Sequence, residues 1–190
     1  MPRRPSYDRD TLIERARDIF WRQGWAGTSL KDLEAVLNMK PGSFYAAFGS
    51  KDALFELALE KYAADGAARL EALAEEHGAL ATLKLYPRLV IENGAAAAKA
   101  CMLAKTVLEL TAREHALADR ANALLLEAEA RFAGLFRRAQ SDGDILESHN
   151  PQALARRYQS DLIGLRISAE RDGVDAQAIA AEISESLDRL

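Results

Sequence analysis

Five side chains in one short stretch of the chain carry groups that bind phosphate oxygens. Thr28, Ser29 and Tyr45 have hydroxyls, and Lys40 and Lys51 have ammonium groups. Together with the free N–H groups at helix starts, such groups are the donors that proteins place against a nucleic-acid backbone. The chemistry indicated by this set is noncovalent binding to phosphates, which would position the protein on a nucleic acid.

A short helix is predicted to begin after Ser29. Ser29 and Asp32 have the spacing of a capping box, in which each side chain satisfies a backbone N–H group at the helix start. The apolar residues that follow recur at helical spacing and define a core-facing side: Leu30, Leu33, Val36 and Leu37.

A second short helix, 41–48, is predicted to follow a tight turn. Asn38 suits the turn because asparagine visits left-handed backbone conformations. Pro41 suits the first helical turn, where its missing N–H group costs nothing. Gly42 and Ser43 are small residues at the N-terminal end of this helix, the end that enters the major groove in helix-turn-helix proteins. We therefore expect residues 41–48, beginning with Pro41, to enter the major groove, with Gly42 and Ser43 closest to the bases.

This stretch resembles the N-terminal signature of the TetR/AcrR-type transcriptional repressors. The similarity is carried by TSLKDLEAVLNMKPGSFYAAFGSKDALF and extends from about Tyr7 to about Tyr62. Ala46 and Ala47 stand where many members have His or Tyr, which removes one base or phosphate contact. The resemblance implies a homodimer that binds a palindromic operator in double-stranded DNA and is released by a small-molecule inducer.

Composition indicates a globular protein. With 190 residues, of which 49% are hydrophobic, the chain is long enough for one large domain or two small ones. No apolar run reaches the roughly 18 residues that span a bilayer, and no apolar segment of a signal peptide follows the charged start. The single cysteine, Cys101, excludes an intramolecular disulfide and fits a reducing compartment. We expect a cytoplasmic protein without a membrane partner.

Charge is divided unevenly along the chain. Residues 1–51 contain nine Lys and Arg against six Asp and Glu, a net charge of +3, whereas the remaining residues contain 16 against 23, a net charge of −7. A basic end on an acidic body orients a molecule on DNA. Arg3 and Arg4 lie in an N-terminal arm that either reaches a DNA groove or backbone or remains solvated.

Apolar residues recur at helical spacing through the rest of the chain, and no segment alternates as a strand does. We expect an all-α fold of about nine helices in two domains, a three-helix helix-turn-helix DNA-binding domain over 1–50 and a ligand-binding and dimerisation domain over 51–190. Besides the two short helices, the predicted helices are 8–23, 51–76, 79–93, 95–111, 115–141, 152–172 and 175–189.

The last two predicted helices carry more apolar surface than one bundle buries. Such a surplus on consecutive terminal helices suits a two-fold helical interface, although an entirely internal core is the alternative. The residues predicted for a dimer interface are Leu162, Ile163, Ile167, Ile179, Ile183 and Leu187.

Aromatic, polarizable and polar residues in the predicted body helices suit an apolar ligand pocket with a few orienting groups. A plain core would use the same residues, and the family resemblance favours the pocket. The residues predicted to line it are Tyr86, Cys101, Met102, Thr106, Glu109, Phe132, Phe136, Tyr158 and Gln159.

Cys101 lies in AKACMLAKTVLEL, which resembles a Gly-Cys-Leu-type segment of family members that respond to electrophiles and oxidants. Lys99 and Lys105 would favour the reactive thiolate by lowering its pKa. The alternative is that the cysteine is a small buried hydrophobic residue.

Motifs for catalysis or metal binding are absent from the sequence. His77, His115 and His149 are scattered, and no phosphate-binding glycine loop, G-x-S-x-G, H-E-x-x-H or paired-cysteine motif occurs. We expect no cofactor, no metal and no enzymatic activity. An all-α ligand carrier or enzyme with a vestigial helix-turn-helix is the alternative from a different class.

Overall fold

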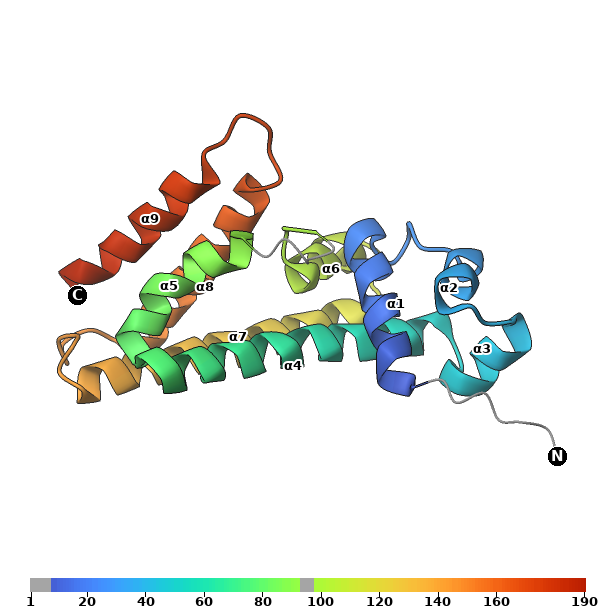
Figure 1. Ribbon diagram of the computed structural model, residues 1–190, viewed down its shortest axis with the longest axis horizontal. Helices are drawn as coiled ribbons and strands as arrows, with labels where there is room; N and C mark the ends of the chain where they lie inside the picture. Colours follow the sequence, from blue (N-terminus) through green and yellow to red (C-terminus); the bar gives the residue numbers. More distant parts are fainter. Residues whose placement is uncertain (1–7, 93–97) are drawn as a thin grey trace.

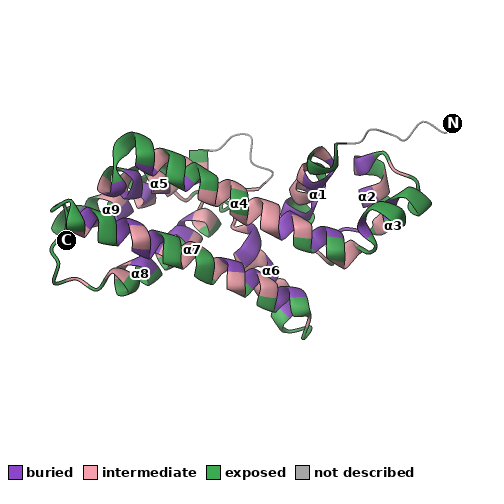
Figure 2. Ribbon diagram, turned by 90° about the horizontal axis from the view of Figure 1, so that it is seen from below, coloured by how far each residue is buried: buried purple, intermediate pink, exposed green. Residues whose placement is uncertain are grey.

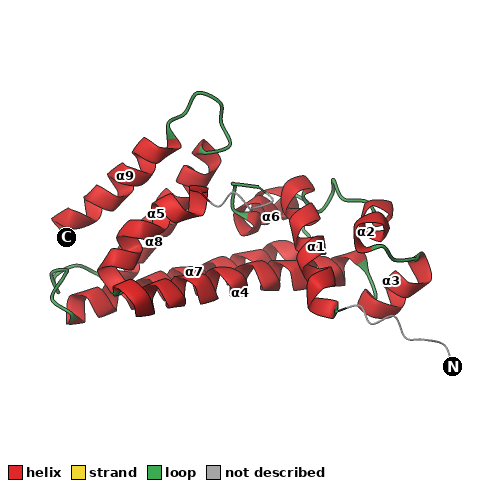
Figure 3. Ribbon diagram, viewed as in Figure 1, coloured by secondary structure: helices red, strands yellow, loops and turns green. Residues whose placement is uncertain are grey.

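The computed structural model describes residues 8–92 and 98–190, and this part of the chain contains helices and no strands (Figures 1 and 3). The predicted all-α fold is confirmed. The helices are α1 (Arg9–Gln23), α2 (Leu30–Leu37), α3 (Pro41–Phe48), α4 (Lys51–His77), α5 (Ala79–Glu92), α6 (Met102–Thr111), α7 (Ala116–Ser141), α8 (Pro151–Ser168) and α9 (Ala176–Ser186), followed by the 3-10 turn η1 (Leu187–Arg189).

The first three helices form a small head at one end of the molecule (Figure 1). The capping box at the start of α2 is present, with reciprocal bonds between Ser29 and Asp32. Asn38 ends α2 in the left-handed conformation, at φ 52° and ψ 47°, as its residue type predicts. The capping box and the left-handed Asn38 therefore begin and end α2 where the sequence predicts, and the chain then turns into α3.

The long helices α4 and α7 lie side by side and connect the head to the body (Figure 1). The apolar interior consists of two clusters along this direction. One joins the head to the first half of α4, α6 and the start of α7, and the other joins the far ends of α4 and α7 to α5, α8 and α9. Because the first cluster includes both Phe44 and Phe55, the apolar core continues across the predicted domain boundary at residue 50.

Helix α6 is shorter than the pattern indicated. A helix was expected over 95–111, but α6 begins at Met102, and residues 98–101 are not helical. The reason is tertiary, because the N–H groups of Lys99 and Ala100 donate to the Glu170 carboxylate, at 2.6 and 2.8 Å. These bonds replace the helical ones that alanine-rich sequence favours. The start of the predicted helix, 95–97, lies outside the described residues.

Gly24 connects the head to α6. Its φ of 78° lies in the region that favours glycine, and a Cβ built there would be 2.6 Å from the Glu109 carboxylate. The same carboxylate accepts from the N–H groups of Trp25 and Ala26, at 3.0 and 2.7 Å. A side chain at this position would therefore both strain the backbone and displace the acceptor that holds the following loop.

Gly24→Ala is expected to lower the free energy of unfolding by about 1–3 kcal/mol, because alanine is strained at this φ and meets Glu109. Urea denaturation at fixed protein concentration measures the change. The matched control is Gly134→Ala inside α7, where the nearest atom is 4.0 Å away and alanine should stabilise the helix by up to about 1 kcal/mol. Equal stabilities of the two variants would contradict the role of Gly24.

Candidate nucleic-acid interface and cavity

Helix α3 presents a polar, small-residue face at the tip of the head. Phe44 and Phe48 are buried beneath it, which is what fixes the helix against the rest of the head. The opposite face is exposed at this end of the molecule (Figure 2). The predicted DNA-contacting residues on that face or at its start are all exposed: Lys40, Pro41, Gly42, Ser43 and Tyr45. Small residues at the start of the helix allow its backbone to approach bases closely.

Thr28 does not belong to this exposed set. Its side chain is fully buried and its hydroxyl donates to the Gly24 carbonyl at 2.7 Å, so the expectation that this hydroxyl reaches a phosphate is corrected. Residue type suggested the contact, but the packing of the loop before α2 turns the hydroxyl inward. Ser29 is exposed at the start of α2 and its hydroxyl bonds Asp32, at 2.6 Å.

Lys51, which is predicted to contact a DNA phosphate, also makes contacts within the protein. Its ammonium group donates to the Thr28 carbonyl at 2.8 Å and lies 4.1 Å from the centroid of the Trp25 ring. Burial lowers the pKa of this ammonium group below its usual range. Lys51 therefore ties the start of α4 to the loop before α2, and its contact with a phosphate stays a prediction.

Arg9 is a cation beside α3 that the sequence analysis did not single out. Its guanidinium lies 6.0 Å from the Phe48 ring centroid, at the start of α1. No local sequence signal marks it, because only the crossing of α1 and α3 brings the two together. The predicted arm residues Arg3 and Arg4 lie outside the described residues.

The head is attached to the body by hydrogen bonds as well as by apolar packing. The Trp21 indole N–H donates to the Ala100 carbonyl at 2.6 Å, and the Lys105 ammonium donates to the Trp21 carbonyl at 2.7 Å. The Trp25 indole N–H donates to Asp52 at 2.8 Å. Trp21 lies near the end of α1 and Trp25 in the loop that follows it, so these bonds tie this end of the head to α6 and to the start of α4.

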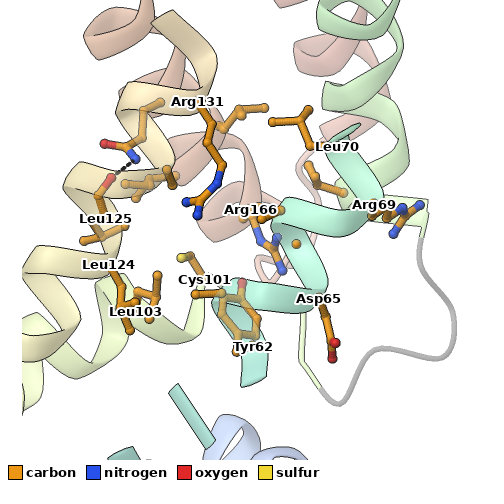
Figure 4. A pocket seen from close by; sticks show the side chains of 18 of the residues that line it. Tyr62, Asp65, Arg69, Leu70, Cys101, Leu103, Leu124, Leu125, Arg131 and Arg166 are labelled. Atoms are coloured by element: carbon orange, nitrogen blue, oxygen red, sulfur yellow. Dashed lines mark hydrogen bonds between the residues drawn. The ribbon is translucent and has the colours of Figure 1, made fainter. Parts of the chain in front are cut away.

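A cavity of about 350 Å³ lies where the head meets the body, lined by residues of α1, α4, α5, α6, α7 and α8 (Figure 4). Four of the nine residues predicted to line a ligand pocket do line it: Tyr86, Cys101, Phe132 and Gln159. Its size and its mixture of apolar walls with a few polar groups are those of a small-molecule site.

The other five predicted residues lie elsewhere. Thr106 is buried and bonds the Met102 carbonyl within α6, and Met102 itself is in the apolar cluster shared with the head. Glu109 holds the loop after α1. Phe136 and Tyr158 are buried in the second cluster, where the Tyr158 hydroxyl donates to the Leu83 carbonyl at 2.6 Å. Helical spacing placed these residues on inward faces, but it did not determine which interior they face.

Several residues that were not predicted for a ligand pocket also line the cavity: Arg17, Trp21, Tyr62, Arg69, Arg131 and Arg166. They come from α1, α4, α7 and α8, so no spacing within one segment could have found them.

The phenols in the cavity remain protonated at neutral pH. Burial raises the pKa of Tyr62 well above its usual value, and the neighbouring Cys101 thiol adds to the effect. Burial likewise raises the pKa of Tyr86, although the Arg166 guanidinium opposes this. Both hydroxyls can therefore act as hydrogen-bond donors to a ligand.

The residues predicted for a dimer interface divide into two groups. Leu162, Ile183 and Leu187 are buried within this chain's own core, and are corrected on that ground, because they have no surface to offer a partner. Ile163 and Ile179 are half-buried, and Ile167 is 45% exposed. Ile163 lines the cavity and Ile179 packs against the second cluster, so of the six predicted residues only Ile167 lies on an outer face.

The described residues contain neither a candidate metal site nor a membrane-spanning helix. No group of three metal-ligating side chains comes together there. In the same part of the chain no helix combines the length and the apolar character that crossing a bilayer requires.

Lys40→Ala is expected to weaken binding to every DNA sequence alike and to reduce the slope of log affinity against log salt by about 1, because one phosphate contact is lost. Fluorescence anisotropy at several salt concentrations measures it. The matched control is Thr28→Val, which removes a buried hydrogen bond worth about 1 kcal/mol of stability but should leave the salt slope unchanged. A slope unchanged by Lys40→Ala would remove this residue from the interface.

Comparisons with known sequences agree with this geometry. Residues 12–58 match the model of the bacterial regulatory proteins of the tetR family. The HTH-type transcriptional repressor ComR of Escherichia coli (strain K12) is 38% identical over 66 residues. These residues are 35% of this chain and 31% of ComR, so this similarity covers about a third of each protein. The uncharacterized HTH-type transcriptional regulator YezE of Bacillus subtilis (strain 168) is 28% identical over 177 residues, 90% of each protein.

Solved structures extend the similarity to the whole chain. A cysteine mutant of the TetR family transcriptional regulator CifR, in complex with 26-base-pair double-stranded operator DNA, superimposes with a TM-score of 0.80 and 29% identity over 97% of each chain. The head with its exposed α3, the helical body and these relatives lead to one conclusion: residues 12–58 form a DNA-binding domain of the tetR family type, and the chain is similar over its length to transcriptional regulators of that family.

Proposed function

We propose that the protein is a homodimeric repressor that binds a palindromic operator and is released when a small molecule enters the cavity. The observation that carries the proposal is the position of the cavity, because Trp21 both lines it and bonds the segment that begins α6. The similar CifR mutant was solved with operator DNA, which supports the DNA part of the proposal.

The cavity and the head share one chain of contacts. The Arg166 side chain lines the cavity and donates through Nε to the Lys99 carbonyl at 2.6 Å. The next residue, Ala100, accepts from the Trp21 indole in α1. A ligand that displaces Arg166 therefore changes the support of the end of α1. It shifts the protein towards a second conformation only if it binds that conformation more tightly.

Two copies are needed for two half-sites. In helix-turn-helix dimers the recognition helices enter major grooves about one helical turn apart, roughly 34 Å. Exposed apolar side chains outside the head are candidates for the surface that a second copy covers, among them Ile167 on α8 and Leu126 on α7, 45% and 58% exposed. A change in the angle between the two heads would then remove the match to the half-sites.

The test begins with selection of bound duplexes from a random pool at near-physiological salt, followed by a screen for compounds that release the selected duplex. We expect a preference for inverted repeats, two subunits per repeat, and release by a cavity-binding compound. A protein that stays monomeric at working concentration and binds palindromic and scrambled duplexes equally would refute the proposal.

Trp21→Phe examines the link between cavity and head. Phenylalanine keeps most of the ring packing but lacks the N–H group that holds Ala100. We expect operator affinity within about threefold of the parent and a weaker response to the releasing compound, since a typical hydrogen bond contributes about 1 kcal/mol. Lys105→Met is the comparison variant. It removes the bond from the Lys105 ammonium to the Trp21 carbonyl and leaves the bond from the Trp21 indole to Ala100 in place.

A second candidate function is thiol-based sensing of electrophiles through Cys101. Its side chain lines the cavity and is half-buried, so a compound that enters the cavity reaches the sulfur. The reaction would be addition of the thiol across an activated double bond, in which the sulfur bonds to carbon and the proton goes to the acceptor. In this case Cys101→Ser should bind operator normally but fail to release it on treatment with a quinone. Normal release by that variant would exclude sensing through this residue.

A further inference from the structure

We propose that the cavity binds an organic anion, an apolar body with one carboxylate or similar acidic group, and that Arg131 and Arg166 bind the acidic end. Since the cavity is also the proposed inducer site, this choice of ligand class rests on the proposed function. The proposal adds the charge of the ligand and the residues that bind its charged end, neither of which follows from the similarity to TetR family regulators.

The walls of the cavity are suited to an apolar body. Side chains from four helices face it without a polar atom, among them Leu70, Leu103, Leu124, Phe132 and Leu162. Burial of such surface against a ligand is favourable in proportion to the area removed from water. The bulk of the ligand is therefore hydrophobic or aromatic.

Two guanidinium groups converge in the same space. Arg131 from α7 and Arg166 from α8 both extend into the cavity (Figure 4). Arg166 uses Nε for the Lys99 carbonyl, and its two terminal nitrogens have no acceptor among the described residues. The carboxylate nearest Arg131 is Glu127, one turn away on an exposed part of α7, at 3.8 Å. Both cations thus retain donors that a ligand can use.

Two carboxylates line the cavity, and both pair with Arg17, which also lines it, and not with Arg131 or Arg166. Asp18 and Asp65 bond Arg17, at 2.8 and 2.6 Å, and Asp65 points away from Arg131 and Arg166 (Figure 4). Glu170, four residues after Arg166, accepts from the backbone N–H groups of Lys99 and Ala100. Residues 1–7 and 93–97 contain no Asp or Glu at all. The described lining therefore has four arginines against two carboxylates, an excess of positive charge, and neither carboxylate pairs with Arg131 or Arg166.

A neutral or cationic ligand fits this arrangement poorly. A neutral molecule that filled the cavity would remove water from the guanidinium groups and offer no charge in return, and a cation would be repelled. A carboxylate is matched to the planar guanidinium fork and accepts two parallel hydrogen bonds from it. The hydroxyl of Tyr62, which stays protonated, extends into the same space and can donate a further bond (Figure 4).

The test uses two dyes with the same skeleton. 8-Anilinonaphthalene-1-sulfonate is an anion, and N-phenyl-1-naphthylamine is its uncharged counterpart, and both fluoresce when bound in an apolar site. Arg131→Met and Arg166→Met are each expected to weaken binding of the sulfonate by at least about tenfold, since a hydrogen bond to a charged group contributes about 1.5–3 kcal/mol. Binding of the neutral dye should stay within about twofold.

The matched control is Arg157→Met, which removes a cation from the same helix as Arg166 at a site 79% exposed. It should leave both dyes unaffected. Arg131 makes no hydrogen bond within the described residues, so Arg131→Met decides the question even if Arg166→Met fails to fold. Equal sulfonate affinity in parent and Arg131→Met, or a parallel loss of both dyes, would overturn the assignment.

The dye titrations contain no DNA, so the two proposals fail separately. If the protein prefers inverted repeats and is released by neutral compounds while Arg131→Met binds the sulfonate normally, the anion site is wrong and the repressor stands. If the sulfonate requires both arginines but no duplex is preferred, the anion site stands and the repressor is wrong.

Discussion

The peptide groups of Lys99 and Ala100 are held by side chains from two other helices, and much of the structure depends on this constraint. Glu170, in the turn after α8, accepts both N–H groups, Arg166 from α8 bonds the Lys99 carbonyl, and Trp21 from α1 bonds the Ala100 carbonyl. Charge-assisted bonds to backbone groups are stronger than those between neutral groups. They stop the segment from continuing as a helix and join three parts of the fold at one point.

The charge of Glu170 follows from the same contacts. Bonds from the Ala100 and Lys99 N–H groups lower the pKa of its carboxyl group below the usual value. A lowered pKa means that the folded protein favours the ionised form, so the contribution to stability is present above the unfolded-state pKa and is lost as pH falls through the folded one. At neutral pH the carboxylate is ionised, holds the segment, and is not available to neutralise Arg166.

The head and the body differ in how their polar groups are arranged. In the head the buried polar atoms, such as the Thr28 hydroxyl, are satisfied within the loop, and the exposed face of α3 is left to contact a nucleic acid. In the body, four arginines line a cavity with two carboxylates, and both carboxylates pair with Arg17. The polar groups of the head are thus bonded within it, whereas the guanidinium groups of Arg131 and Arg166 keep unused donors, which is the difference that the proposed anion site uses.

The sequence alone determined the features that depend on neighbours a few positions away. The capping box at Ser29, the left-handed Asn38, the position of Pro41 and the helical fold follow from local hydrogen bonding and periodicity, and the family signature lies in the same stretch. Tertiary structure decided the inward turn of Thr28, the start of α6 at Met102, and the meeting of Arg131 with Arg166. Periodicity states which side of a helix faces inward, but the neighbour that it meets is set by how helices far apart in the chain pack together.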